Sequence, residues 1–216
     1  MMHRVHSLWR EHRPFILFVC LMLLFRSVIA DWNTVPSGSM KPTILEGDRI
    51  LVNKMAYDLR LPFSQISLLK WGDPERGDII IFDSAIADMR LVKRVVGLPG
   101  DWIAMTDNHL WINDRKLGYR EDPTHLGSSD KIEDLLGIEY RIRWLGTDSR
   151  LSSFKPLRVP QDHYLVLGDN RNNSADSRVI GFVPRREIVG RARHLVLSLD
   201  YDNHYLPRLD RYLQRL

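Results

Sequence analysis

Cysteine is almost absent from this chain, which has a single thiol, Cys20, among 216 residues. One cysteine excludes intramolecular disulfides and zinc sites built from several thiolates. The sequence also lacks a phosphate-binding loop and any metal-ligand spacing, so we expect no cofactor and no bound metal. No block of lysine and arginine is long enough to indicate a nucleic-acid surface, and the net charge is a modest +4. We therefore expect no nucleic-acid partner.

Long helical patterns are also missing after residue 31, where no extended amphipathic period occurs. Apolar residues make up 44% of the chain and charged residues 27%, a composition that supports a packed core. Short runs rich in β-branched residues and bounded by Gly, Pro, Asp or Asn predict strands at 49–54, 78–82, 91–96, 163–167 and 192–199. The runs 102–105 and 109–112 flank a short polar loop and predict a hairpin. The fold is therefore expected to be mainly β.

Residues 118–158 lack this pattern of short apolar runs, because they are polar and poorly periodic. Their pattern predicts a loop-like insertion or subdomain of the domain 33–216, outside its core.

The N-terminal segment contains the one long apolar run, Phe15 to Phe25, after a basic stretch over residues 1–13. That run alone is short of the roughly 20 residues that cross a bilayer. Counted over residues 14–32, with Arg26 extending to the interface, the segment is long enough for a transmembrane anchor. The positive flank predicts a cytoplasmic N-terminus at residues 1–13 and an exported remainder.

A cleavable signal peptide is the alternative for the same segment, because Val28-Ile29-Ala30 offers small residues at a cleavage position. Arg26, between the apolar run and that position, disfavours cleavage. Both alternatives export the rest of the chain.

Two serines lie in an irregular segment, Val35 to Thr43, that contains Pro36 and Pro42. The prolines disfavour a regular helix, and Gly38 permits backbone angles that other residues avoid. Such a turn can bring a hydroxyl and a backbone N–H to one point. Taken alone, the composition fits an ordinary surface turn equally well.

Lys93 lies in the predicted strand 91–96, where alternation places it on one face and Arg94 on the other. An exposed strand lysine is the ordinary interpretation. If Lys93 is instead buried, its pKa falls, and a shift from about 10.4 to about 8 costs roughly 3 kcal/mol. The neutral amine can then take a proton from a serine hydroxyl, as in Ser–Lys nucleophilic catalysis.

A polar loop, Gly168 to Arg178, follows the predicted strand 163–167. Gly, Asp, Asn and Ser dominate ordinary turns, so its composition alone indicates structure. Its many hydrogen-bonding groups also suit a loop that supports an active site. Asp176 and Arg178 can form an ion pair there, and Ser174 can orient a nearby amine.

The three segments 36–40, 93–101 and 168–178 together resemble the motifs of bacterial type I signal peptidases, in the order typical of that family. Residues 76–82 match a further family segment, and the resemblance covers about 26–110 and 160–195. It implies a serine endopeptidase, anchored in the bacterial inner (plasma) membrane by one span, which removes signal peptides from exported preproteins. The implied catalytic domain is an antiparallel β-fold on the periplasmic or outer side, and the implied partners are preproteins and membrane lipid.

The resemblance also implies roles for single residues. Ser39 corresponds to the nucleophile and Lys93 to the general base, and the Ser37 hydroxyl joins the Ser39 backbone N–H in the oxyanion hole. Ser174 corresponds to a serine that hydrogen-bonds the lysine amine, and Asp176 and Arg178 correspond to a supporting ion pair. Val35 and Val92 correspond to residues that line the substrate pocket. The family usually has an acid where this chain has Asn172.

The distance from Ala30 to Ser39, at most about 30 Å when fully extended, would place the site of an uncleaved protein close to the bilayer. This geometry favours the anchor over the cleaved signal.

Four alternatives carry less weight. A Ser-His-Asp hydrolase could use His163 or His194, but no G-x-S-x-G motif occurs. Ser152 and Lys155 match S-x-x-K, yet Pro156 disfavours the helix which that motif needs. A self-cleaving repressor would need a DNA-binding domain and no membrane segment. A membrane-tethered β-domain that binds exported proteins without cutting them is the non-enzymatic alternative.

Overall fold

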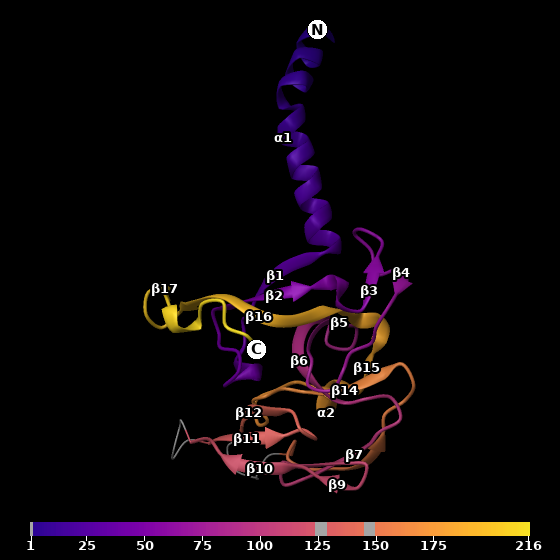
Figure 1. Cartoon of the computed structure of the whole chain (residues 1–216), viewed down its shortest axis with the longest axis vertical. Helices are drawn as coiled ribbons and strands as arrows, with labels where there is room; N and C mark the ends of the chain where they lie inside the picture. Colours follow the sequence, from indigo (N-terminus) through magenta and orange to yellow (C-terminus); the bar gives the residue numbers. More distant parts are fainter. Residues whose placement is uncertain (1, 124–128, 145–149) are drawn as a thin grey trace.

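The computed structural model describes residues 2–123, 129–144 and 150–216. Helix α1 (Met2–Val28) extends away from the β-sheets, and Figure 1 shows it in indigo above them. In the part of the chain described, no helix is both long and apolar enough to cross a membrane. The helix also ends before Trp32, the predicted end of the anchor, because Ala30–Thr34 forms strand β1, which pairs with β2.

The main sheet is antiparallel, as the resemblance implied, and has the strand order β1-β2-β16-β5-β6-β14-β15, with β17 paired to β16. Each of the five strands predicted from β-branched runs is present. The remaining bounds are β2 (Asp48–Asn53), β5 (Ile79–Ser84), β6 (Met89–Gly97), β14 (His163–Leu167), β15 (Val183–Pro184), β16 (Ile188–Asp200) and β17 (Leu206–Pro207).

Strand β5 shows why the apolar runs form the centre of this sheet. Ile79 and Ile81 pack into one buried cluster, whereas Ile80 and Phe82 pack into another on the opposite face. Because both faces are covered, the strand is continuously apolar rather than alternating. Burying each of these side chains contributes about 1.5–3 kcal/mol to folding.

Two smaller antiparallel sheets lie at the end of the molecule away from α1 (Figure 1). The predicted hairpin is confirmed, since β7 and β8 pair from Ile103 with Ile112 to Thr106 with His109. The bounds are β7 (Trp102–Thr106), β8 (His109–Ile112), β9 (Arg115–Lys116) and β13 (Phe154–Arg158) in one sheet, and β10 (Gly118–Glu121), β11 (Asp130–Asp134) and β12 (Glu139–Arg143) in the other.

The expectation that residues 118–158 are loop-like is wrong, and their description as an insertion or subdomain stays a prediction. Four strands, β10 to β13, lie within it, and Leu135, Tyr140 and Ile142 belong to a buried cluster shared with β7 and β14. The pattern was obscured because charged residues occupy inward positions, including Glu133, which is fully buried against Arg171. Parts of the segment, 124–128 and 145–149, lie outside the described residues.

Short elements complete the fold. Strands β3 (Asp58–Arg60) and β4 (Ser67–Lys70) form a separate two-stranded sheet. After residue 31, the one α-helix in the described chain is α2 (Ser177–Ile180). The 3-10 turns are η1 (Gly38–Met40), η2 (Lys54–Ala56), η3 (Arg185–Glu187) and η4 (Leu209–Arg211).

Candidate active site

Ser39 lies in the 3-10 turn η1 and is partly exposed, between two buried neighbours, Gly38 and Met40. Met40 and Ile44 are fully buried in the core, and the Ile44 N–H donates to the Met40 carbonyl over 2.9 Å. The buried residues Met40 and Ile44 therefore anchor the turn in the core, while Ser39 itself stays partly exposed. The Ser37 hydroxyl lies 3.4 Å from Ser39 Oγ, so both serines face the same place.

Lys93 on β6 is 2% exposed, and its Nζ lies 2.9 Å from Ser39 Oγ and 2.8 Å from the Val92 carbonyl. Burial lowers the pKa of Lys93 to about 8, although the negative charges of Asp176 and Asp169 work in the opposite direction. A neutral amine that accepts a hydrogen bond from a serine hydroxyl is the arrangement a general base requires. The geometry thus brings together the two residues expected to act as a pair.

A cavity of about 280 Å³ opens beside this pair. Its walls include Val35 and Val92, the two expected pocket residues, together with Ser37, Ser39 and Lys93. Sequence reasoning missed five further lining residues: Met89, Arg90, Leu91, Asn173 and Ala175. Met89 and Leu91 have a periodic signal, because they stand four and two positions before Lys93 and therefore share its face of strand β6.

Residues 168–170 hold the backbone of the Ser39 turn. The Asn170 side-chain amide donates to the Gly38 carbonyl over 3.0 Å, and the Asn170 N–H donates to the Ser39 carbonyl over 3.1 Å. At Gly168 a Cβ atom would lie 2.5 Å from the Ser39 carbonyl oxygen and 2.3 Å from Ser174 Oγ, so only glycine fits between them. Asn170 was within the predicted loop but was not identified as a site residue.

Asp176 and Arg178 form the expected ion pair, which is buried. The pair is bidentate, because Arg178 Nε and Nη2 donate to the two Asp176 carboxylate oxygens over 2.8 and 2.7 Å. Burial opposes the charge of Asp176, but the hydrogen bonds and charge of Arg178 hold the pKa of that carboxyl below its usual value. The carboxylate also accepts the Gly168 N–H at 3.0 Å, and Arg178 donates to the Leu151 carbonyl. The pair therefore fixes the loop that contacts the Ser39 turn.

Ser174 is buried near the site, but the expected hydrogen bond to the Lys93 amine is not formed among the described residues. The amine is engaged by Ser39 and by the Val92 carbonyl instead, and the Ser174 side chain packs beside Gly168.

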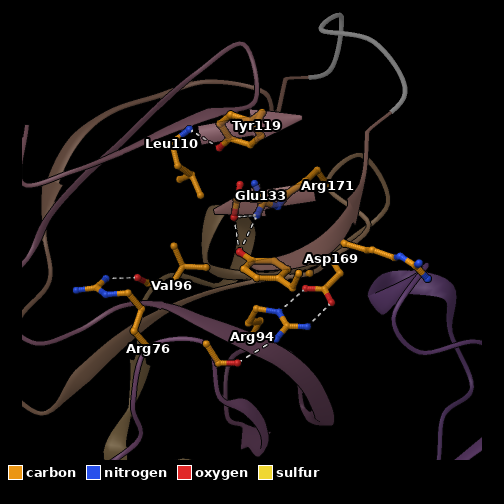
Figure 2. A network of polar contacts seen from close by, with 12 residues as sticks. Arg76, Arg94, Val96, Leu110, Tyr119, Glu133, Asp169 and Arg171 are labelled. Carbon is orange, nitrogen blue, oxygen red and sulfur yellow. Dashed lines mark hydrogen bonds and ion pairs between the residues drawn. The ribbon is translucent and has the colours of Figure 1, made fainter. Parts of the chain in front are cut away.

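Arg94, the neighbour of Lys93, is buried too, so β6 places one cation on each face. It forms a bidentate pair with Asp169 at 2.7 and 2.9 Å, and its guanidinium lies 4.1 Å from the centre of the Tyr140 ring. Figure 2 shows this pair next to a second buried group, in which Glu133 contacts both Arg171 and the Tyr140 hydroxyl. The polar network connects β11 and β12 with the loop that supports Ser39.

The other catalytic candidates lie elsewhere. Lys155 is exposed on strand β13, not on the helix that an S-x-x-K pair needs, and neither His163 nor His194 lines the cavity at Ser39. Within the described residues, no three His, Cys, Asp or Glu side chains are grouped to hold a metal ion.

Comparison with known proteins gives consistent matches. The family described as "Signal peptidase, peptidase S26" matches residues 9–197. The chain is 39% identical over 193 residues to a signal peptidase I of Pseudomonas fluorescens, covering 82% of this chain and 67% of that protein. It is 35% identical to a signal peptidase I of Rickettsia felis over 218 residues, covering 88% and 79%. A crystal structure of a signal peptidase I from Enterococcus faecalis matches with 31% identity and a TM-score of 0.37, over 55% of this chain and 96% of that one.

Proposed function

Because the chain belongs to the signal peptidase family, peptidase S26, we propose that Ser39 is its nucleophile and Lys93 its general base. The protein is a serine endopeptidase that cleaves signal peptides, and preproteins bearing them are the family's substrates. The observation that carries the residue assignment is the 2.9 Å contact between Ser39 Oγ and a lysine amine that is almost fully buried.

The proposed reaction begins when the neutral Lys93 amine takes the proton of Ser39 as Oγ attacks the carbonyl carbon of the scissile peptide bond. The resulting oxyanion is stabilised by the Ser39 N–H and by the Ser37 hydroxyl, and one such donor contributes about 3 kcal/mol. The Lys93 ammonium then protonates the leaving amine, and the peptide C–N bond breaks. Water, deprotonated by the same amine, hydrolyses the Ser39 ester and restores the enzyme.

The free edge of β6 is the proposed docking place for the substrate backbone. Strand β14 pairs with β6 only from Arg94 to Gly97, and β5 occupies the opposite edge. The stretch 89–93 is therefore open on the side of the cavity, and an extended peptide can add there as a strand. Side chains of the preprotein before the cleaved bond then enter the cavity lined by Val35 and Val92.

Supporting roles are proposed for the residues around this pair. Asp176 and Arg178 fix the loop 168–178, and Asn170 holds the two carbonyls of the Ser39 turn. Ser174 would orient the amine during the reaction, because a lysine ammonium has three donors and Ser39 and the Val92 carbonyl engage only two of them here.

The pH dependence of cleavage tests Lys93 as the base. Only the neutral amine can accept the serine proton, and its pKa lies at about 8. We expect kcat/KM for a preprotein to fall about tenfold per pH unit below that value and to level off above it. A rate that stays flat from about pH 6 to 9 would contradict a lysine base, whereas a midpoint near 6.5 would indicate histidine.

The apolar part of α1 is the proposed single-pass anchor in the bacterial plasma membrane. It places residues 1–13 in the cytoplasm and the catalytic domain, residues 33–216, on the periplasmic or outer side. Phe15, Leu17, Phe18 and Leu21 are each more than half exposed, with fractions of 66%, 57%, 61% and 57%. Side chains of this size and number on a projecting helix favour contact with lipid over contact with water.

Sequencing the N-terminus of the mature protein tests the anchor. Because Arg26 pairs with Asp31 at 2.6 Å and Ala30 begins a paired strand, cleavage after Ala30 would cut between bonded residues. We expect residues 1–30 to remain in the mature protein. A mature N-terminus at Asp31 would instead identify residues 1–30 as a removed signal peptide.

A further inference from the structure

A second cavity, of about 250 Å³, lies between the end of α1 and strand β6, and we call it the upstream cavity. Ser27 and Val28 line it from the last turn of α1, and Gln65 lines it from the loop between β3 and β4. Asp83 of β5 and Arg90 of β6 line it from the main sheet. The upstream cavity therefore reaches from the helix to the strand that contains Lys93.

Arg90 joins the upstream cavity to the candidate active site. It lines the upstream cavity and also the cavity that contains Ser39 and Lys93, and it is the one residue common to the two linings. The two cavities therefore meet at the Arg90 side chain. A peptide that passes from one cavity to the other must pass this guanidinium.

The Arg90 guanidinium is fixed in place but has a free edge. Its Nε and Nη2 atoms donate to the two carboxylate oxygens of Asp83 over 2.7 and 3.0 Å. Nη1 donates to no residue in the part of the chain that the structure describes, and the side chain is 41% exposed. Because arginine keeps its charge at any working pH, Arg90 offers a permanent cation with an unused donor.

Positive charge is in excess among the groups that face the upstream cavity. Three basic residues line it, Lys54, Arg60 and Arg90, whereas Asp83 alone among its described lining residues is acidic. Lys54 and Arg60 pair with aspartates over 3.6 and 3.2 Å, but these aspartates lie outside the lining. An acidic side chain that enters the cavity is therefore favoured, and a basic one is disfavoured.

The direction of approach decides which part of a preprotein meets Arg90. A signal peptide precedes the cleaved bond and contains an apolar segment, which stays with the bilayer beside the proposed anchor α1. The chain between that segment and Ser39 therefore runs from the end of α1 along residues 89–93. An extended peptide advances about 3.3 Å per residue, so the residue beside Arg90, about 10 Å from Lys93, is roughly the fourth before the cleaved bond.

We propose that the upstream cavity binds the signal peptide about four to six residues before the cleaved bond, and that Arg90 determines specificity there. Arg90 favours an acidic side chain at these positions and disfavours a basic one. This inference rests on the signal peptidase function and on the anchor proposed above. It adds a charge preference, set by a residue of β6 other than Lys93, to the binding of the residues next to the bond.

The test compares three forms of one preprotein that differ only at the fifth residue before the cleaved bond, which is Glu, Gln or Lys. The full chain in detergent cleaves each form, and kcat/KM is measured for the wild type, Arg90→Gln and Arg158→Gln. Arg158 is an exposed arginine of β13 that lines neither cavity, in the small sheet away from α1 (Figure 1). It provides the matched control for the loss of one positive charge.

We expect the wild type to cleave the Glu form about three- to tenfold faster than the Lys form, with the Gln form between them, as a partly exposed ion pair allows. Added salt should reduce this ratio, since it screens the charges. In Arg90→Gln the ratio should fall to about one or below, because Asp83 then lacks its partner. Arg158→Gln should keep the wild-type ratio.

Equal cleavage of the three forms by the wild type would overturn the proposal. A ratio that Arg90→Gln leaves unchanged would also overturn it, because another group would then select the charge. Faster cleavage of the Lys form would instead place the peptide on the other side of the Arg90–Asp83 pair, in a cavity lined by Asp88 and Glu187. If no form is cleaved, the proposed function itself fails, which is a different result from equal cleavage.

Discussion

Preprotein cleavage is expected to disappear when Ser39 or Lys93 is replaced by alanine, with a loss of about 10⁴-fold or more in kcat. Ser39→Ala removes the hydroxyl that contacts the buried amine at 2.9 Å. Lys93→Ala removes the base, so Ser39 Oγ keeps its proton at neutral pH. Because the two groups act as one unit, the double variant should lose no more activity than either single variant.

Two further substitutions at Lys93 separate chemistry from packing. Lys93→Met keeps most of the buried volume but has no proton acceptor, and Lys93→Arg keeps a cation that does not lose its proton at any working pH. Both should be inactive while the fold is retained. Lys155→Ala, on the exposed face of β13, is the matched lysine control and should cleave normally. The readout is cleavage of a preprotein by detergent-solubilised enzyme, and substantial activity in Ser39→Ala or Lys93→Met would refute the pair.

The second large effect is expected on stability, from the buried ion pair between β11 and the loop that supports Ser39. Glu133 and Arg171 have fully buried side chains and lie 2.6 Å apart, with the Tyr140 hydroxyl in contact with both. Burial opposes the charge of Arg171, yet the charge of Glu133 keeps the pKa of the guanidinium well above its ordinary value. The cation therefore persists in the core because its partner is present.

Glu133→Ala should lower the free energy of unfolding by about 3–5 kcal/mol, because an unpaired buried charge is far more costly than an exposed one. Glu139→Ala is the matched control on the neighbouring strand, where Glu139 and Arg120 form an ion pair with half-exposed side chains. That pair should contribute at most about 1 kcal/mol. Chemical unfolding of the solubilised protein, followed by tryptophan fluorescence, measures both values.

A double variant shows whether the cost comes from the orphaned charge. Glu133→Leu combined with Arg171→Met replaces both ions with apolar groups of similar size and should recover a large part of the stability lost in Glu133→Ala. If the double variant is as unstable as the single one, packing rather than charge pairing explains the effect. Activity should follow stability here, since Arg171 directly succeeds Asn170, which holds the Ser39 turn.

The main strands and the hairpin at 102–112 could be predicted from sequence because their signal is local. A run such as residues 79–82 is apolar throughout and bounded by polar or charged residues, so its neighbours in the chain are enough to identify it. The candidate catalytic residues could also be identified from local sequence. The turn with two serines and a glycine precedes the strand that contains the lysine, and this order is typical of the family. The pairing of Ser39 with Lys93 joins residues 54 positions apart, so it could be expected from the family resemblance but not from local sequence, and the structure gives its distance of 2.9 Å.

Charged residues in the core are where sequence reasoning failed. Residues 118–158 were expected to be a loop-like polar insertion or subdomain rather than core, because buried charged residues such as Asp130 and Glu133 break the apolar pattern of β11. Whether a carboxylate can be buried depends on a cation beside it in space, and Arg171 is 38 positions away from Glu133. The same limit applies to Arg94, whose burial depends on Asp169.

The sequence by itself determined that the chain after residue 31 is mainly β, that Ser39 and Lys93 are the candidate pair, and which family their motifs resemble. These follow from residue type and short-range order. Only the tertiary structure decided that both basic side chains, Lys93 and Arg94 of β6, are buried and that Ser174 does not hydrogen-bond the amine. The physical reason is the same in each case: the protonation, pairing and exposure of a side chain depend on groups distant in sequence that folding brings within a few ångströms.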